Sequence, residues 1–272
     1  MTRISKNQLL TIAKQLSDTQ ASILGLLGSH RFATTDQLAR YHQPLYKSKN
    51  SAIRQTNRTT KHLANLGLIR HLNRRIGGSR SGSSGYIWHL TEAGQRLAGI
   101  DPKDPLPHLR PTNRWREPSL TFLTHTLAVT EVRIIFEETS HNQPLKIVSV
   151  ETEPACWRQH ISDYGQTETL KPDIAIITKQ ANYEDHWWCE IDLGSENPAR
   201  ITQKALTYLN HYNYGIEQQT RGIFPKVLWI TPTKTRCNQL QKILTTSPKL
   251  PAGMHTASTL EQLPNLICQK QS

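Results

Sequence analysis

The chain has 272 residues, 36% of them hydrophobic, and a mean hydropathy of −0.56, so it has room for two ordinary domains. It contains no run of 18 or more apolar residues, which excludes a membrane span. The net charge of +12 is uneven: residues 1–118 carry 19 Lys and Arg against 6 Asp and Glu, and residues 119–272 are almost neutral, so we expect the first part to meet a polyanion.

The N-terminus and the cysteines both indicate a cytoplasmic protein. The first 15 residues, MTRISKNQLLTIAKQ, contain no uncharged apolar segment of the kind that a secretory signal needs. The four cysteines are far apart and form neither a CxxC pair nor a zinc spacing. Reduced, buried thiols are therefore expected, and no membrane partner is expected.

Three helices and a hairpin are predicted within residues 1–100. Ser17 or Asp18 can cap the first helix, and Thr34 or Thr35 can cap a short second helix. The third helix runs roughly over residues 48–66, and Gly67 ends it. A β-like run at residues 68–76, a Gly- and Ser-rich tip at 77–85 and a second β-like run at 86–91 follow. A short helix at residues 91–99 closes the unit.

The third helix has two distinct faces. Ala52, Thr56, Leu63 and Leu66 form an inward stripe, and cationic side chains lie on another face. Three helices followed by a hairpin are the order of a winged helix-turn-helix, whose third helix enters the DNA major groove. Arg and Lys suit phosphates or guanine, and Asn suits adenine. The predicted DNA-binding residues are Lys49, Arg54, Asn57, Arg58 and Lys61 on the helix, and Arg74, Arg75 and Arg80 in the hairpin.

The segment from residue 63 to residue 94 also resembles winged-helix regulators. "LANLGLI" leaves the third helix, and "YIWHLTEAG" follows the basic turn. In such families a Leu-Thr-x-x-Gly step ends the second wing strand, and Leu90, Thr91 and Gly94 match it. Double-stranded DNA is the expected partner of this part; the alternative is a domain that contacts only protein.

A proline-rich stretch, residues 101–118, separates two domains in this interpretation. It contains five prolines, which block helix continuation. We therefore predict domains at residues 1–100 and 119–272. The predicted elements of the second domain alternate between helix and strand, which indicates an α/β domain. Its helices are expected at 118–140, 198–212, 235–246 and 258–268, and its strands at 146–150, 173–178, 187–193 and 226–230.

Carboxylates interrupt two of the apolar strands of this second domain. Asp173 begins one, and Glu190 and Asp192 share one face of another because side chains alternate along a strand. Buried carboxylates are costly without a cation, a basic partner or solvent, and Mg²⁺ is one solution. Glu131 continues an apolar helix stripe, and we expect its side chain to point toward the other three.

Four segments together resemble the replication-relaxation family of plasmids and integrative elements over roughly residues 18–235. They are "HTLAVTEVRIIFEE", "LKPDIAII", "WWCEIDLGSENPARITQKALTYLNHY" and "FPKVLWIT". The resemblance implies a winged helix-turn-helix followed by a domain similar to the PD-(D/E)XK restriction-endonuclease fold. The expected fold class is thus α/β (α+β) with these two parts.

The resemblance also assigns roles to the carboxylates. Asp173 and Glu190 match the residues that bind Mg²⁺ in active nucleases of that fold, and Glu131 matches a helix glutamate. Asp192 departs from the pattern, because it stands where such enzymes carry the lysine that orients the attacking water. Lys204 can supply that charge from the next helix, with Tyr208 beside it at i+4. Three interpretations stay open: a metal-dependent catalytic site, a residual site that binds without turnover, and a structural network.

The resemblance implies a DNA-binding accessory protein of a mobile element. It would assist a relaxase or a replication initiator in plasmid replication or conjugative mobilisation, and it can act as a homodimer on repeated half-sites. Two alternatives remain at this stage. One is a Mg²⁺-dependent DNA nickase or endonuclease, and the other is a transcriptional repressor whose C-terminal domain senses a ligand or dimerises.

Overall fold

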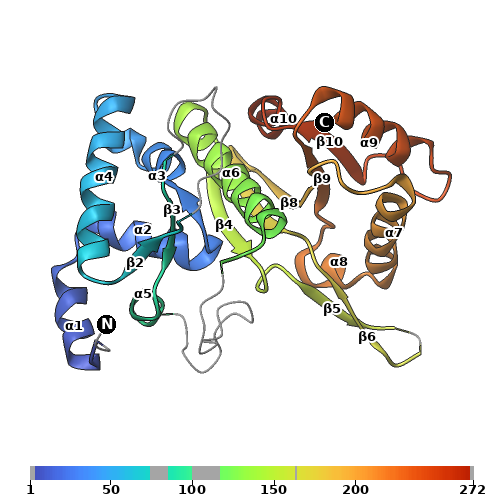
Figure 1. Ribbon diagram of the computed structural model, residues 1–272. Helices are drawn as coiled ribbons and strands as arrows, with labels where there is room; N and C mark the ends of the chain where they lie inside the picture. Colours follow the sequence, from blue (N-terminus) through green and yellow to red (C-terminus); the bar gives the residue numbers. More distant parts are fainter. Residues whose placement is uncertain (1–3, 74–84, 100–116, 163, 270–272) are drawn as a thin grey trace. The chain divides into compact units, whose positions relative to one another are not determined.

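Two compact units make up the protein, Met1–Ile134 and Ile135–Ser272. The structure, a computed structural model, describes residues 4–73, 85–99, 117–162 and 164–269 (Figure 1). Most of the predicted proline-rich linker and of the wing tip therefore lies outside the described residues, and the domain boundaries drawn around residues 101–118 stay predictions. In the described part of the chain, no helix has both the length and the apolar character needed to cross a bilayer.

Helices dominate the first unit, and their starts follow the predicted capping residues. Ser17, Thr34 and Ser48 each accept a hydrogen bond from the backbone amide three residues on, which fixes the first turns of α2, α3 and α4. Gly67, with φ of +73°, allows the chain to leave α4. The helices are α1 (Lys6–Gln15), α2 (Asp18–His30), α3 (Thr35–Tyr41), the 3₁₀ turn η1 (Gln43–Leu45), α4 (Lys49–Asn65), α5 (Glu92–Leu97) and α6 (Leu120–Asn142), which crosses the boundary between the units.

A small antiparallel sheet in the order β1-β3-β2 completes the first unit. Its strands are β1 (Ala33–Thr34), β2 (Ile69–His71) and β3 (Ile87–Leu90). Gly94 lies just beyond β3, where a Cβ atom would come within 2.0 Å of the carbonyl oxygen of Leu68. Thr91 fixes this approach, since its hydroxyl contacts the carbonyls of Gly67 and Leu68 and accepts from the Gly94 amide. The Leu-Thr-x-x-Gly step thus packs α5 closely against the backbone of Leu68, the residue before β2.

The core of the first unit joins its helices to this sheet. Leu27, Leu38 and Leu63, from three different helices, are at most 1% exposed and pack with Trp88 of β3. A second cluster places Leu123 of α6 against the sheet, together with Phe32, Leu72, Ile87 and Leu127. The inward stripe predicted for α4 is therefore confirmed, because Ala52, Thr56 and Leu63 are buried and Leu66 is partly buried against the same core.

The second unit is built on a mixed five-stranded sheet in the order β10-β9-β8-β7-β4. β7 pairs antiparallel with both β4 and β8, whereas β9 pairs parallel with both β8 and β10. The strands are β4 (Lys146–Thr152), β7 (Ile174–Gln180), β8 (Tyr183–Ile191), β9 (Lys226–Thr231) and β10 (His255–Thr259). Its helices are α7 (Pro198–Tyr214), α8 (Ile216–Arg221), α9 (Lys234–Thr246) and α10 (Leu263–Cys268), besides the end of α6.

One face of this sheet is covered by α7 and α9. Trp188 and Trp229 project from β8 and β9 into a cluster with Tyr208 of α7 and Leu240 of α9. Glu190 lies two residues after Trp188 on β8, so strand alternation turns its side chain toward the same helices. Asn197 caps α7, and Pro198 is its first residue, as the sequence predicts.

Several features of the fold differ from the sequence prediction. α1, α8 and a separate hairpin of β5 (Arg158–Ile161) and β6 (Thr167–Leu170) were not predicted. The helix expected near residues 258–268 is confirmed only in its second half, because the chain first forms β10 and α10 begins at Leu263. β10 completes the parallel edge of the sheet against β9, and these backbone hydrogen bonds outweigh the local helical pattern.

Candidate functional site

The outward face of α4 is cationic and open to solvent. Arg54, Asn57, Arg58 and Lys61 are exposed, whereas Thr56, Thr59 and Thr60 pack inward. Among the described residues, none of these four side chains forms an ion pair or a side-chain hydrogen bond. Unpaired guanidinium and ammonium groups on one helix face are suited to bind the phosphates and base edges of nucleic acid.

Lys49 differs from the other predicted cations of α4. Its Nζ lies 3.9 Å from a carboxylate oxygen of Asp36 on α3, and 68% of its side chain is exposed. Asp36 also lies 3.8 Å from Arg40, one turn further along α3. Lys49 thus sits at the junction of the two helices, and screening makes such an exposed pair weak.

The wing is described only at its base. Arg74, Arg75 and Arg80 lie outside the described residues. On β2, Arg70 and His71 are exposed, and the ring of His71 stacks on Tyr86 with centroids 4.3 Å apart. Sequence reasoning did not select Arg70, although it stands in the same basic run as Arg74 and Arg75.

Asp173 and Glu190 come together at the junction of β7 and β8. The amide of Asp173 donates to the carbonyl of Cys189, and its carboxylate accepts from the Ile191 amide at 2.7 Å. The Asp173 carboxylate is therefore held beside the strand that carries Glu190, and its negative charge contributes to the raised pKa of Glu190.

Glu190 is buried and is bonded to two residues of α7. Lys204 Nζ lies 2.5 Å from one carboxylate oxygen, and the Tyr208 hydroxyl donates to the other. Burial raises the pKa of Glu190 to about 8, although Lys204 and Tyr208 oppose the rise. Burial lowers the pKa of Lys204, but the carboxylates of Glu190 and Asp173 raise it overall. The predicted approach of Lys204 to Glu190 is thus present in the structure.

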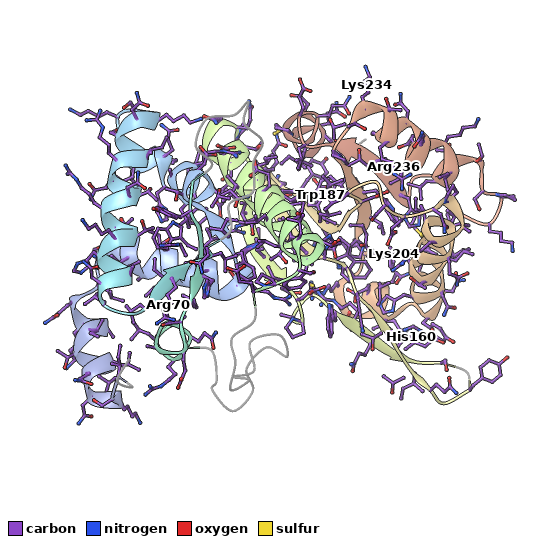
Figure 2. The ribbon with its side chains drawn as sticks, in the orientation of Figure 1. Arg70, His160, Trp187, Lys204, Lys234 and Arg236 are labelled. Atoms are coloured by element: carbon purple, nitrogen blue, oxygen red, sulfur yellow. The ribbon has the colours of Figure 1, made fainter. Side chains whose placement is uncertain are left out.

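Asp192 has a different cationic partner, Arg236 of α9. Arg236 Nε and Nη2 lie 2.9 and 2.6 Å from the same oxygen of Asp192, while the other oxygen accepts from the Gly194 amide. Figure 2 labels Lys204 and Arg236, the two cations that reach these carboxylates from α7 and α9. Arg236 was not predicted, because 44 residues separate it from Asp192 and no spacing motif joins them.

Glu131 lies in the first unit and contacts α3. Its carboxylate pairs with Arg40 at 2.5 Å and accepts from Gln37 at 3.0 Å. Gln37 also donates to the carbonyl of Leu127, so two residues of α3 are bonded to α6. The structure therefore places Glu131 in a helix-to-helix contact, and the carboxylate set beside α7 and α9 consists of Asp173, Glu190 and Asp192.

A magnesium ion does not fit this carboxylate set well. Mg²⁺ requires free, deprotonated carboxylate oxygens with room for water. Lys204 and Tyr208 bind Glu190, and Arg236 binds Asp192. Across the described part of the chain, no three His, Cys, Asp or Glu side chains are arranged to hold a metal ion. The cations beside Glu190 and Asp192 are thus the protein's own side chains, Lys204 and Arg236.

Comparison with known proteins places both units in one family. The sequence model of the replication-relaxation family matches residues 24–227, from α2 to the start of β9. No curated protein matches the sequence significantly. Since the match covers most of the chain, the protein belongs to the replication-relaxation family.

Proposed function

We propose that this protein is a DNA-binding accessory factor of a mobile element, which binds duplex DNA through α4 and supports plasmid replication or mobilisation. The observation that carries the proposal is the outward face of α4. Arg54, Arg58 and Lys61 are exposed there without a partner among the described residues, opposite a packed inner face. Family membership supports the replication-associated role.

The arrangement of the first unit supports a winged helix-turn-helix. α2, α3 and α4 pack around one core, and the β2–β3 pair follows α4. In this fold the third helix lies in the major groove and the hairpin reaches the backbone. On this proposal Arg58 and Asn57 read base edges, while Lys61 and Arg54 bind phosphates. A homodimer on two half-sites would extend the short site that one unit can read.

The second unit is proposed to act without cleaving DNA. The meeting of Asp173, Glu190 and Lys204 favours a relationship with PD-(D/E)XK nucleases. However, Asp192 occupies the position of the expected lysine and is bound by Arg236. A negative charge there opposes the stabilisation of a phosphorane-like transition state. We propose that this unit serves contacts with a relaxase or a replication initiator.

The binding part of the proposal is tested by fluorescence anisotropy with a duplex of about 30 base pairs at low ionic strength. The triple variant Arg54→Ala/Arg58→Ala/Lys61→Ala should bind at least roughly tenfold more weakly than the wild type. The matched control removes three exposed lysines of the second unit: Lys146, Lys179 and Lys234. Equal losses in both triple variants would mean that only the net charge matters, and the proposed interface would be wrong.

The same protein preparation tests the alternative function, that of a Mg²⁺-dependent DNA nickase. Supercoiled plasmid carrying the element's origin is incubated with the protein and Mg²⁺ or Mn²⁺. We expect binding without nicking. Nicking that disappears in Asp173→Ala and Glu190→Ala would instead establish a nuclease.

A further inference from the structure

The β5–β6 hairpin is attached to the second unit by Leu170, which is buried in the core beside α7, and by a set of polar side chains. Among the described residues, its two strands pair only with each other, and an isolated two-stranded hairpin is marginally stable in water. Ile161 and Tyr164 near its end are 70% and 92% exposed. Contacts at its base therefore decide whether the hairpin stays docked.

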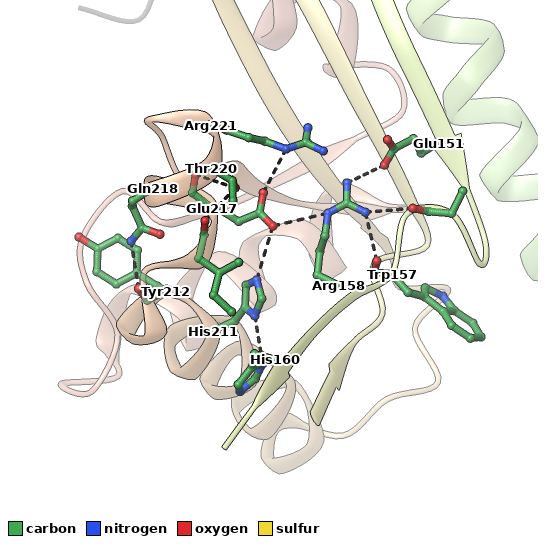
Figure 3. Close-up of polar contacts among 12 residues, drawn as sticks. Glu151, Trp157, Arg158, His160, His211, Tyr212, Glu217, Gln218, Thr220 and Arg221 are labelled. Carbon is green, nitrogen blue, oxygen red and sulfur yellow. Dashed lines mark hydrogen bonds and ion pairs between the residues drawn. The ribbon is translucent and has the colours of Figure 1, made fainter. Parts of the chain in front are cut away.

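A continuous chain of buried polar groups forms that base (Figure 3). His160 of β5 contacts His211 of α7, with their Nδ1 atoms 3.2 Å apart. His211 Nε2 lies 3.6 Å from Glu217 of α8, and the same oxygen lies 3.5 Å from Arg158 Nε. Arg158 in turn pairs with Glu151 of β4 at 2.5 Å. The hairpin is thus connected to α7, α8 and the main sheet.

The contact between the two histidines depends on their protonation. A hydrogen bond between two Nδ1 atoms requires one N–H donor and one lone pair, so at most one ring can be protonated on both nitrogens. If both rings carry a positive charge, both Nδ1 atoms are donors and the contact becomes repulsive. His160 and His211 are 6% and 0% exposed, so solvent cannot relieve this repulsion while the hairpin is docked.

We propose that the His160–His211 pair is a pH-sensitive latch, which holds the β5–β6 hairpin on α7 near neutral pH and releases it when both rings are protonated. The proposal does not depend on DNA binding. Release would alter the surface that Ile161 and Tyr164 present to a partner.

The charged groups around the two histidines can offset one protonated imidazole ring. Glu168 of β6 lies 3.4 Å from His160 Nε2, and Tyr214 of α7 packs its ring against His160. On the other side, Glu217 faces His211 and is itself paired with Arg158 and Arg221. The buried carboxylate is therefore already neutralised, and only the half-exposed Glu168 is left to offset a second imidazolium.

The direction of the pH effect follows from His160. Burial and the adjacent His211 lower its pKa below the ordinary 6.5, against the opposing charge of Glu168. The released state takes up the proton more readily, so docking is lost as the pH falls below 6.5. At a mildly alkaline pH the docked state is favoured.

Amide hydrogen–deuterium exchange of the full-length protein, with EDTA present, tests the latch. Peptides covering residues 158–170 are compared at about pH 7.5 and about pH 5.5 after correction for intrinsic exchange, and peptides from β7 and β8 serve as internal controls. We expect the hairpin to lose protection at the lower pH, because the released state takes up the proton more readily than the docked state. Unchanged protection of the wild-type hairpin would overturn the proposal without any variant.

Replacing His160 with a residue that cannot be charged tests whether this histidine causes the pH response. In His160→Asn an amide takes the place of the Nδ1 edge and cannot become charged, so the pH response of the hairpin should largely disappear. The matched control is His141→Asn at an exposed position of α6, which should respond like the wild type. The same pH response in His160→Asn would contradict the proposal. So would zinc-induced protection of the wild-type hairpin that His160→Asn abolishes, because the pair would then be a metal site.

Discussion

Arg236 of α9 binds Asp192 through two nitrogen atoms, Nη2 and Nε, which lie 2.6 and 2.9 Å from the same carboxylate oxygen. Arg236 also donates to the carbonyl of Glu196 at 2.6 Å, which connects α9 to the loop before α7. Asp192 is 3% exposed. The pair therefore holds the β8–α7 loop in place as well as balancing a buried charge.

Breaking this pair should destabilise the second unit. Asp192→Asn leaves a largely buried guanidinium without its partner, and such changes cost about 3–5 kcal/mol. Urea unfolding of the full-length protein measures the loss. The double variant Asp192→Asn/Arg236→Met should be less destabilised than the sum of the two single variants. Strict additivity would mean that the two side chains contribute independently.

Glu190 should make stability depend on pH in an uncommon direction. Burial raises its pKa from 4.5 to about 8, so between these values the folded protein holds a proton that the unfolded chain releases. Stability from this group is full below pH 4.5 and is lost as the pH rises toward 8. Glu190→Gln cannot titrate, so its free energy of unfolding relative to the wild type should increase from about pH 5 to about pH 8. A constant difference across that range would show that Lys204 keeps Glu190 ionised throughout.

Two glycines of the first unit should respond oppositely to alanine. Gly94→Ala places a Cβ atom 2.0 Å from the Leu68 carbonyl oxygen, and overpacking of this kind costs about 1–3 kcal/mol. Gly25 lies inside α2, and nothing lies within 4 Å of the position that a Cβ atom would take there. Gly25→Ala should therefore stabilise the protein by up to about 1 kcal/mol through helix propensity. Thermal unfolding distinguishes them, and similar shifts would show that α5 moves freely away from β2.

A substitution at Arg58 tests whether α4 recognises the base sequence of the DNA. Arg58→Ala should weaken binding to a duplex selected by the wild type by about 1–3 kcal/mol, while the melting temperature stays nearly unchanged because the side chain is exposed. Competition with random duplex measures the loss of specificity. Equal weakening on both duplexes would assign Arg58 to phosphates instead.

Local signals in the sequence predicted the helices that begin or end at a recognisable capping residue. Ser48 and Gly67 bound α4, and Asn197 with Pro198 starts α7, because caps act within a few residues. Helical periodicity likewise separated the inner and outer faces of α4.

Long-range contacts were much harder to predict. Arg40 pairs with Glu131 from 91 residues away, so the position of Glu131 on a helix stripe could not show which unit it would face. The strands of the β5–β6 hairpin have four residues each and mixed polarity, which gives no clear period. Its histidine contact joins residues 51 positions apart.

The salt dependence of DNA affinity tests the central claim most directly. The logarithm of the binding constant of the wild type should fall linearly with the logarithm of salt concentration, since cations displaced from phosphates are released. Removing Arg54, Arg58 and Lys61 should reduce the slope by about two, because Arg54 and Lys61 are the proposed phosphate contacts. Removing Lys146, Lys179 and Lys234 should leave the slope unchanged. An identical slope in the wild type and the α4 variant would contradict binding through this helix.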